Sequence, residues 1–222
     1  MGERKNGKRI VLRGQTREFN ALANKSGSHP YIYLLSPADS AGRRAQMLLN
    51  PRATFALAER LRTTGIPLGE AFSFMSALYF RGKLAYANAL ARSQEGLPGT
   101  LIITSSRGLL PPESMVSLED LAEIAGERIV AENPKYRDPL ERDLRALSEA
   151  IGERFRVVLL GSIATRKYIP LLREVLGERL LVPQAFIGLG NMRRGALLLK
   201  CSREKRELKC VPIAEALRRA TR

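Results

Sequence analysis

The chain has 222 residues, and 37 Lys and Arg against 22 Asp and Glu give it a formal net charge of +15 at pH 7. This length fits one large domain, which buries enough apolar surface to hold a core without disulfides or metal. A charge of this size predicts a negatively charged partner, which could be nucleic acid, an anionic membrane or an acidic protein, with nucleic acid expected first. The plain alternative is a solubilising, Arg-rich surface.

The two cysteines, Cys201 and Cys210, match neither a disulfide framework nor a zinc-binding spacing. We therefore expect a reduced, cytoplasmic protein. No signal peptide is expected, because no apolar segment follows the basic N-terminal residues. The longest apolar stretch, 65–80, is interrupted by Glu70 and is too short to span a bilayer, so no membrane partner is expected.

Residues 1–28 are predicted to form a basic N-terminal arm ahead of a single α/β domain at 29–222. Seven Lys and Arg in this arm face only two Glu. Such segments often contact phosphates, although a solvated tail explains the same composition equally well.

Short apolar runs predict the core strands of the domain. They span residues 31–35, 101–104, 157–160 and 180–182. Helical patterns separate these runs, which predicts an α/β layered fold with a largely parallel sheet flanked by helices. Residues 196–200 and 208–211 predict a C-terminal antiparallel β-hairpin.

Several signals predict where helices begin and end. Asn50-Pro51 predicts a helix start, and Ser117 predicts another through a capping box. Asp138-Pro139 predicts the start of a later helix. Gly82 is expected to interrupt the helix that follows Pro67, because Gly lowers helix propensity by about 1 kcal/mol relative to Ala.

Polar loops follow three of the predicted strands, at 36–44, 105–108 and 161–167. Parallel strands end at the same edge of a sheet, and ligands bind there in open α/β folds. The N-terminus of the helix predicted after the third loop favours binding of an anion. The alternative is that this loop is an ordinary strand-to-helix turn with no binding role. The residues predicted to bind phosphate or nucleic acid are Ser36, Arg43, Arg44, Tyr79, Arg81, Lys83, Ser105, Arg107, Gly161, Ser162, Arg166, Lys167, Arg193 and Arg194.

Asp39 is the only carboxylate in these loops and is the candidate catalytic residue. Excising a base through an oxocarbenium-like transition state needs one carboxylate, positive charge for the phosphates and a pocket. The alternative is that Asp39 or Ser40 caps the next helix. His29 is the only histidine, which disfavours a Ser-His-Asp triad and a histidine metal site, and we predict neither metal nor cofactor.

Short motifs carry a resemblance to a known family. They are Leu35-Ser36-Pro37-Ala38, the segment 103–111 with Ser105-Ser106-Arg107-Gly108-Leu109-Leu110, the segment 78–83, and more loosely Leu159-Leu160-Gly161 with Gly188-Leu189-Gly190. This pattern resembles the YaaA family of bacterial peroxide-stress proteins and the related domain beside archaeosine-synthase catalytic domains. The resemblance implies an α/β fold with a basic, DNA-binding cleft. It would place around that cleft Ser36, Asp39, Tyr79, Arg81, Ser105 and Arg107.

One departure from the family pattern bears on chemistry. YaaA proteins usually have Lys after Ser-Pro-Ala, whereas this chain has Asp39. The resemblance therefore supports the fold more directly than a shared reaction.

The sequence favours a nucleic-acid-binding protein, with DNA ahead of RNA, that processes damaged or modified bases without a metal. One alternative is a small-molecule enzyme acting on a nucleoside or sugar phosphate, which predicts an enclosed pocket rather than an open groove. Another is an interaction module whose basic surface binds an acidic protein.

Overall fold

A computed structural model describes residues 30–91, 96–165 and 167–220, so the predicted basic arm lies outside the described residues. The fold is α/β, as predicted, and is built on a six-stranded sheet. Its strands are β1 (Tyr31–Leu35), β3 (Thr100–Ile103), β4 (Leu109–Leu110), β6 (Arg156–Leu160), β7 (Leu180–Pro183) and β8 (Cys210–Pro212). They are arranged in the order β4-β3-β1-β6-β7-β8.

The inner strands β3, β1, β6 and β7 are parallel, and the outer strands β4 and β8 run antiparallel to their neighbours. β1 and β6 pair at the centre, with Tyr33 opposite Val158 and Leu35 opposite Leu160. Both strands are almost entirely apolar because helices cover both faces of a parallel sheet.

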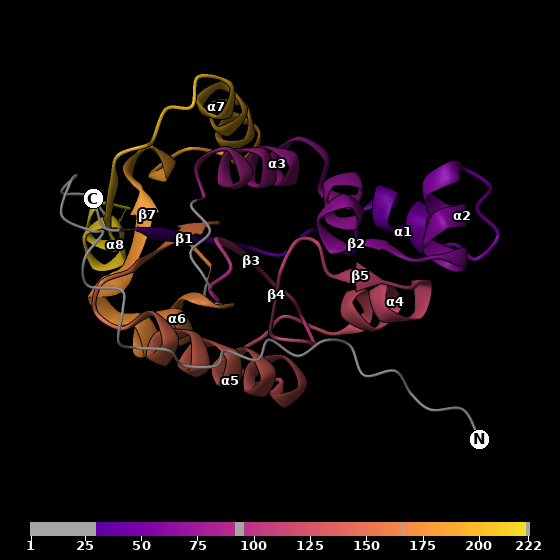
Figure 1. The fold of residues 1–222 in the computed structure, drawn as a ribbon, viewed down its shortest axis with the longest axis horizontal. Helices are drawn as coiled ribbons and strands as arrows, with labels where there is room; N and C mark the ends of the chain where they lie inside the picture. Colours follow the sequence, from indigo (N-terminus) through magenta and orange to yellow (C-terminus); the bar gives the residue numbers. More distant parts are fainter. Residues whose placement is uncertain (1–29, 92–95, 166, 221–222) are drawn as a thin grey trace.

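The two faces of the sheet carry separate hydrophobic clusters. Tyr33 and Leu35 face the layer that contains α3 (Leu68–Leu90) and α7 (Asn191–Arg203). Ile32 and Leu34 face the opposite layer. That layer consists of α5 (Pro134–Ile151), α6 (Ile169–Leu176) and α8 (Ile213–Ala220). Figure 1 shows α3 and α7 on one side of the strands and α5 and α6 on the other.

Several short elements gather at one end of the molecule, on the right in Figure 1. They are α1 (Arg43–Leu49), α2 (Ala56–Thr63), α4 (Leu118–Gly126) and the two-stranded sheet of β2 (Ile66–Pro67) and β5 (Met115–Val116). We call this group the end lobe. α3 has 23 residues and is about 34 Å long, so it runs from the end lobe across the sheet. Two 3₁₀ turns flank β7, η1 (Gly177–Arg179) and η2 (Gln184–Phe186).

The predicted break at Gly82 is wrong, because α3 continues through this residue. Gly82 instead allows α3 and α7 to cross closely. A Cβ atom at Gly82 would lie 2.6 Å from the Gly195 carbonyl oxygen, and one at Gly195 would lie 3.0 Å from the Leu78 carbonyl oxygen. The glycine signal in the sequence therefore marks a helix contact rather than a helix end.

The predicted strand at 196–200 is also wrong, because these residues belong to α7. The buried positions Gly195, Leu198 and Cys201 recur every three residues, which is helical spacing. Leu is a strong helix former, so this short apolar run fits a helix as well as a strand. An antiparallel pair is present near the C-terminus, but it joins β8 to β7, with Val211 opposite Val182.

Two predicted helix starts are displaced. α5 begins at Pro134 rather than at Asp138-Pro139, because the Asn133 side chain accepts a hydrogen bond from the Lys135 N–H (3.2 Å). α2 begins at Ala56 rather than after Asn50, whose side chain accepts from the Arg52 N–H (2.9 Å) and forms a turn.

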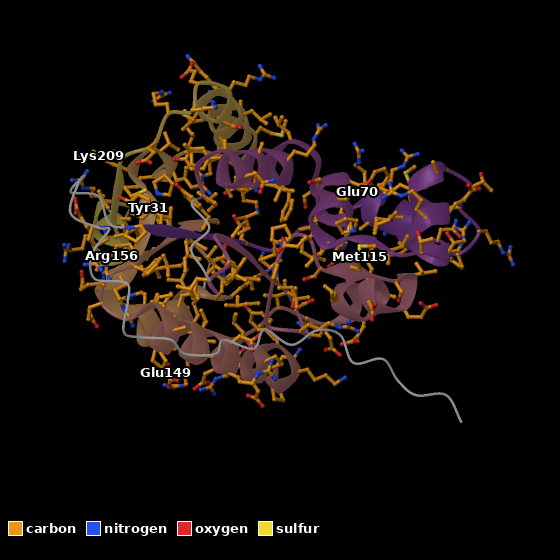
Figure 2. All side chains as sticks on the ribbon, viewed as in Figure 1. Tyr31, Glu70, Met115, Glu149, Arg156 and Lys209 are labelled. Carbon is orange, nitrogen blue, oxygen red and sulfur yellow. The ribbon has the colours of Figure 1, made fainter. Side chains whose placement is uncertain are left out.

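Charged side chains cover the outer surfaces of the helices. Glu149 on α5 points away from the sheet in Figure 2. On the same helix, Arg145 forms an ion pair with Glu141 (2.7 Å). In the part of the chain that the structure describes, no helix is long and apolar enough to cross a membrane.

We expect Gly82→Ala to destabilise the protein, because its Cβ atom would meet the α7 backbone at 2.6 Å. The strain should exceed the gain in helix propensity and lower the free energy of unfolding by about 1–3 kcal/mol. Chemical denaturation measures this difference. Gly126→Ala is the matched control, because a Cβ atom there meets nothing within 4 Å. Equal stability of the Gly82 variant and the wild type would show that the helices are not in close contact.

Candidate functional site

The carboxyl ends of β1 and β6 form the central point of the sheet edge. After β1 the chain passes to the layer of α3, and after β6 it passes to α6 in the opposite layer. Such a switch in direction between neighbouring parallel strands is where ligands bind in open α/β sheets. The Ser36 N–H donates to the Leu160 carbonyl oxygen (3.2 Å), which joins the two strands up to this edge.

Lys83 of α3 lies buried over the end of β1. Its Nζ atom donates to the Ser36 carbonyl oxygen (2.6 Å) and to Ser36 Oγ (2.9 Å). The Tyr79 and Phe80 ring centroids lie 4.8 and 4.6 Å from the same nitrogen. Only 1% of Lys83 is exposed, so the ammonium group is enclosed by neutral oxygens and aromatic rings.

Burial lowers the pKa of Lys83 to about 7, because a charged group is poorly solvated in the protein interior. Among the residues that the structure describes, no carboxylate contacts this side chain. Near neutral pH the amine is therefore divided between two forms. The charged form can hold an anion, and the neutral form can accept a proton from the Ser36 hydroxyl.

Gly161 brings the β6 loop against Ser36. A Cβ atom at Gly161 would lie 2.9 Å from Ser36 Cβ and 2.9 Å from the Tyr168 hydroxyl oxygen, so a larger residue does not fit. The Tyr168 hydroxyl donates to the Ser162 carbonyl oxygen (3.1 Å). Burial raises the pKa of Tyr168 to about 12, and the neighbouring Ser36 hydroxyl opposes that rise. Tyr168 was not among the predicted site residues.

Arg194 adds a second buried cation beside Tyr79. Its Nη2 atom donates to the Phe186 carbonyl oxygen (2.8 Å), and only 7% of the residue is exposed. Burial raises the pKa of Tyr79, and the charge of Arg194 opposes this rise. Because this opposing effect acts at short range, the two side chains lie together. The Tyr79 hydroxyl and Arg194 Nε are buried and lack aligned hydrogen-bond partners in the described structure.

Six predicted binding residues therefore meet at the switch point. With Tyr168 they form what we call the switch-point cluster, made of Ser36, Tyr79, Lys83, Gly161, Ser162, Tyr168 and Arg194. Sequence patterns indicated most of its members. A tyrosine shortly after a Gly-Ser turn was the available signal for Tyr168.

Asp39 lies outside this cluster, on an exposed turn before α1. Its Oδ1 atom accepts from the Ala41 N–H (3.1 Å), and its own N–H donates to Ser76 Oγ (2.6 Å). The capping alternative is wrong, because the N-cap residue of α1 is Gly42 and no side chain caps this helix.

Ser105 and Arg107 follow β3 at the same edge but contact the end lobe. Ser105 Oγ donates to the Ile124 carbonyl oxygen. Arg107 pairs with Asp120 (2.8 Å) and Glu123 of α4. The charge of Arg107 is therefore neutralised. Asp120 also completes the predicted capping box with Ser117.

Exposed cations surround the switch-point cluster in sequence. In the described ranges, four of the predicted residues are exposed and form no ion pair, Arg43, Arg81, Lys167 and Arg193. Arg44 is exposed and lies 4.7 Å over the Phe74 ring. Arg166 is outside the described residues.

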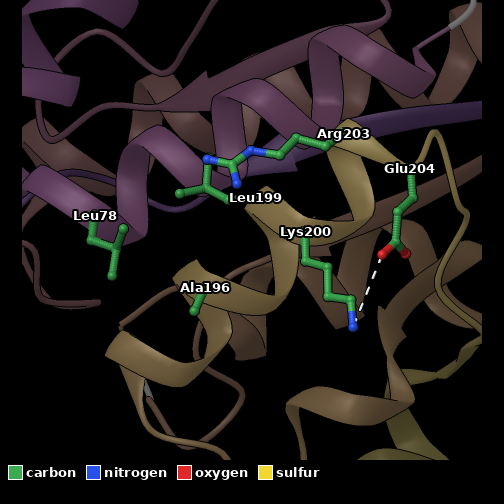
Figure 3. Close-up of a pocket in the computed structure, with 6 residues that line it drawn as sticks. All are labelled: Leu78, Ala196, Leu199, Lys200, Arg203 and Glu204. Atoms are coloured by element: carbon green, nitrogen blue, oxygen red, sulfur yellow. Dashed lines mark ion pairs between the residues drawn. The ribbon is translucent and has the colours of Figure 1, made fainter.

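A groove of about 470 Å³ lies beside α3 and α7, lined by Leu78, Ala196, Leu199, Lys200, Arg203 and Glu204. Lys200 and Glu204 point toward each other across it at 4.0 Å (Figure 3). This groove contains no member of the switch-point cluster. Lys200 and Glu204 pair with each other, while Arg203 is exposed and forms no ion pair within the described ranges.

No group of three or more His, Cys, Asp or Glu side chains that could hold a metal ion occurs within the described ranges. Comparison with known proteins adds no relative, because no family model, curated protein or solved structure matches the chain.

We expect the stability of the wild type to rise with pH above 7 more steeply than that of Lys83→Met. Lys83 has a folded-state pKa of about 7, below the value of roughly 10.4 in an unfolded chain. Between these values the unfolded state binds more protons, so unfolding becomes harder by up to about 1.4 kcal/mol per pH unit. Below pH 7 the ammonium is charged in both states and contributes no slope.

Urea denaturation below and above pH 7 measures this difference. Lys209→Met is the matched control, because Lys209 is exposed and its removal should leave the pH profile unchanged. Parallel pH profiles for the wild type and Lys83→Met would contradict a buried lysine that titrates near neutrality.

Proposed function

We propose that this protein binds nucleic acid, with DNA preferred to RNA, at the carboxyl edge of its sheet. There it acts on damaged or modified bases in a metal-independent, glycosylase-like reaction. The resemblance to the YaaA family favours DNA. A reducing, cytoplasmic setting is part of the proposal, because Cys201 and Cys210 are both free thiols.

The observation that carries this proposal is a set of exposed cations that form no ion pair within the described ranges, most of which neighbour switch-point cluster residues in the sequence. They come from separate segments, namely Arg43 of α1, Arg81 of α3, Lys167 of the β6 loop and Arg193 of α7. Three of the four stand beside or close to a switch-point cluster residue in the sequence. Exposed cations with no acidic partner are free to contact phosphates, which supply most of the affinity in nucleic-acid binding.

The base-processing part of the proposal depends on one residue, Asp39. Glycosidic bond cleavage needs a carboxylate near the anomeric carbon and a base removed from its stack. Asp39 is exposed on the loop that follows β1, and its carboxylate is held by one backbone N–H. It therefore remains the candidate general acid or base in this proposal.

A second candidate function is favoured by the buried position of Lys83 and Ser36. Polar groups that lie beneath the sheet edge suit a small phosphorylated ligand better than an open duplex. An enzyme acting on a nucleoside or sugar phosphate would use the same cluster. Stabilisation by such small ligands, without binding to duplex DNA, would favour this alternative.

We expect binding to double-stranded DNA to weaken steeply with salt, since log K falls by about 0.9 for each phosphate neutralised. The double variant Arg81→Gln/Arg193→Gln should lower the affinity and reduce the salt slope by about one unit per lost contact. Fluorescence anisotropy at several salt concentrations measures both quantities.

The control for this experiment removes the same charge elsewhere. Arg128 and Arg173 are exposed arginines after α4 and on α6. Arg128→Gln/Arg173→Gln should change the salt slope less than the first pair does. Equal effects of the two pairs would reduce the interaction to non-specific attraction, and salt-insensitive or absent binding would contradict nucleic-acid binding.

If bases are excised, Asp39→Asn should lower the excision rate by at least about 100-fold and leave DNA affinity unchanged, because general acid–base catalysis typically contributes that much. Oligonucleotides with deaminated, oxidised or alkylated bases are the substrates. Asp138→Asn removes another exposed carboxylate and should have no effect. Undiminished excision by Asp39→Asn would exclude this residue as the catalyst.

A further inference from the structure

We propose that Lys83, Tyr79 and Arg194 form a binding site for a single phosphoryl oxyanion at the switch point between β1 and β6. This inference rests on the proposed function, because it concerns the same site. It names the chemical group that the switch-point cluster recognises, whereas the exposed cations around it would contact a longer polyanion.

The three side chains hold hydrogen-bond donors without an aligned acceptor, apart from a contact between the Tyr79 hydroxyl and Arg194 that opposes the burial-driven rise in the pKa of Tyr79. The Lys83 ammonium has three N–H groups and uses two of them on Ser36. Four buried side-chain polar atoms lack a partner in the described structure, and two of them, the Tyr79 hydroxyl and Arg194 Nε, lie here. Buried donors in native proteins are nearly always satisfied, so donors that converge without acceptors point to a ligand rich in acceptors.

The charges at this point also lack compensation. Neither Lys83 nor Arg194 contacts a carboxylate in the described part of the chain, and their acceptors are carbonyl and hydroxyl oxygens. Tyr79 contacts both side chains, with its ring centroid 4.8 Å from the Lys83 nitrogen and its hydroxyl beside Arg194. Buried charges are normally paired, because an unpaired charge is poorly solvated. One anion between these side chains would compensate both cations.

The start of α7 adds partial positive charge on the same side. Its N-cap residue is Gly190, no side chain caps its first turn, and no acidic residue stands there. Arg194 lies close to this end, where its N–H donates to the Gly190 carbonyl oxygen (3.0 Å). Helix N-termini favour phosphate groups because their N–H groups are unpaired and their dipoles are aligned.

A phosphoryl group fits these donors better than other anions do. It offers several oxygens around one centre, and three side chains from α3 and α7 converge with at least one unused donor each. The site also meets the solvent at its edge, because Ser36 and Arg194 each retain 7% exposure. The neighbouring exposed residues Lys167 and Arg193 would attract an anion toward that edge.

The phosphoryl group could belong to the end of a nucleic-acid strand or to a free nucleotide. The shared chemistry is a phosphate monoester, and the two sources are distinguished by the probe. The probes are inorganic phosphate, a nucleoside monophosphate, and one oligonucleotide with either a 5′-phosphate or a 5′-hydroxyl group.

Binding of inorganic phosphate is measured first, by calorimetry and by the thermal stability of the full chain at constant ionic strength. We expect phosphate to raise the melting temperature where chloride does not. Tyr79→Phe removes only the hydroxyl group and should weaken phosphate binding about tenfold. Tyr136→Phe is the matched control, because it removes another buried, unpartnered hydroxyl, on α5, and should leave binding unchanged. Arg194→Met should abolish phosphate binding.

Equal phosphate affinity in the wild type, Tyr79→Phe and Arg194→Met would overturn the site, and so would the absence of any stabilisation by phosphate. If the 5′-phosphorylated oligonucleotide binds more tightly than its 5′-hydroxyl counterpart, the site recognises a strand end. If only the monophosphate binds, the inference stands and the proposed nucleic-acid function fails. If duplex DNA binds and phosphate does not, the proposed function stands and this inference fails.

Discussion

The buried contact between the Lys83 side chain and Ser36 is the polar contact on which the candidate site depends. It joins α3, which comes from the end lobe, to the carboxyl end of the central strand β1. Lysine is rarely buried without a charged partner, and here its neighbours are neutral oxygens and aromatic rings. The apolar side chains of α3 pack it against the sheet, and within that packing α3 carries a group whose charge is not fully compensated.

Close approaches at glycines bring the other cluster residues to the same sheet edge. α3 approaches α7 closely because glycines face each other at the crossing, and this brings Arg194 to Tyr79. The β6 loop meets Ser36 because Gly161 leaves room for it. Arg81, Lys167 and Arg193 are exposed and neighbour cluster residues in the sequence, while Arg107 of the β3 loop is paired with α4. Lys83 and Arg194 are the two cations that the structure buries in the cluster itself.

Much of the fold could be predicted from the sequence, because strands buried on both faces appear as short apolar runs between turn residues. That the residues after β1 and β6 lie together could be predicted for the same reason, since topology brings them to one edge. The burial of Lys83 and Arg194 could not, because composition favours exposed cations and only tertiary packing shows otherwise. The 196–200 run and Gly82 were misassigned for a related reason, since local patterns do not show which helix lies opposite.

If the proposed site exists, a bound anion supplies the counter-ion that the buried Lys83 side chain lacks. NMR titration of the Lys83 side-chain nitrogen tests it directly, in the free protein and with inorganic phosphate. Lys83 should have a pKa of about 7 in the free protein, because burial opposes the charge. Bound phosphate should raise that pKa by about 1–3 units, as a nearby opposite charge does. A free-protein pKa near the ordinary lysine value, or a pKa unchanged by phosphate, would contradict the account.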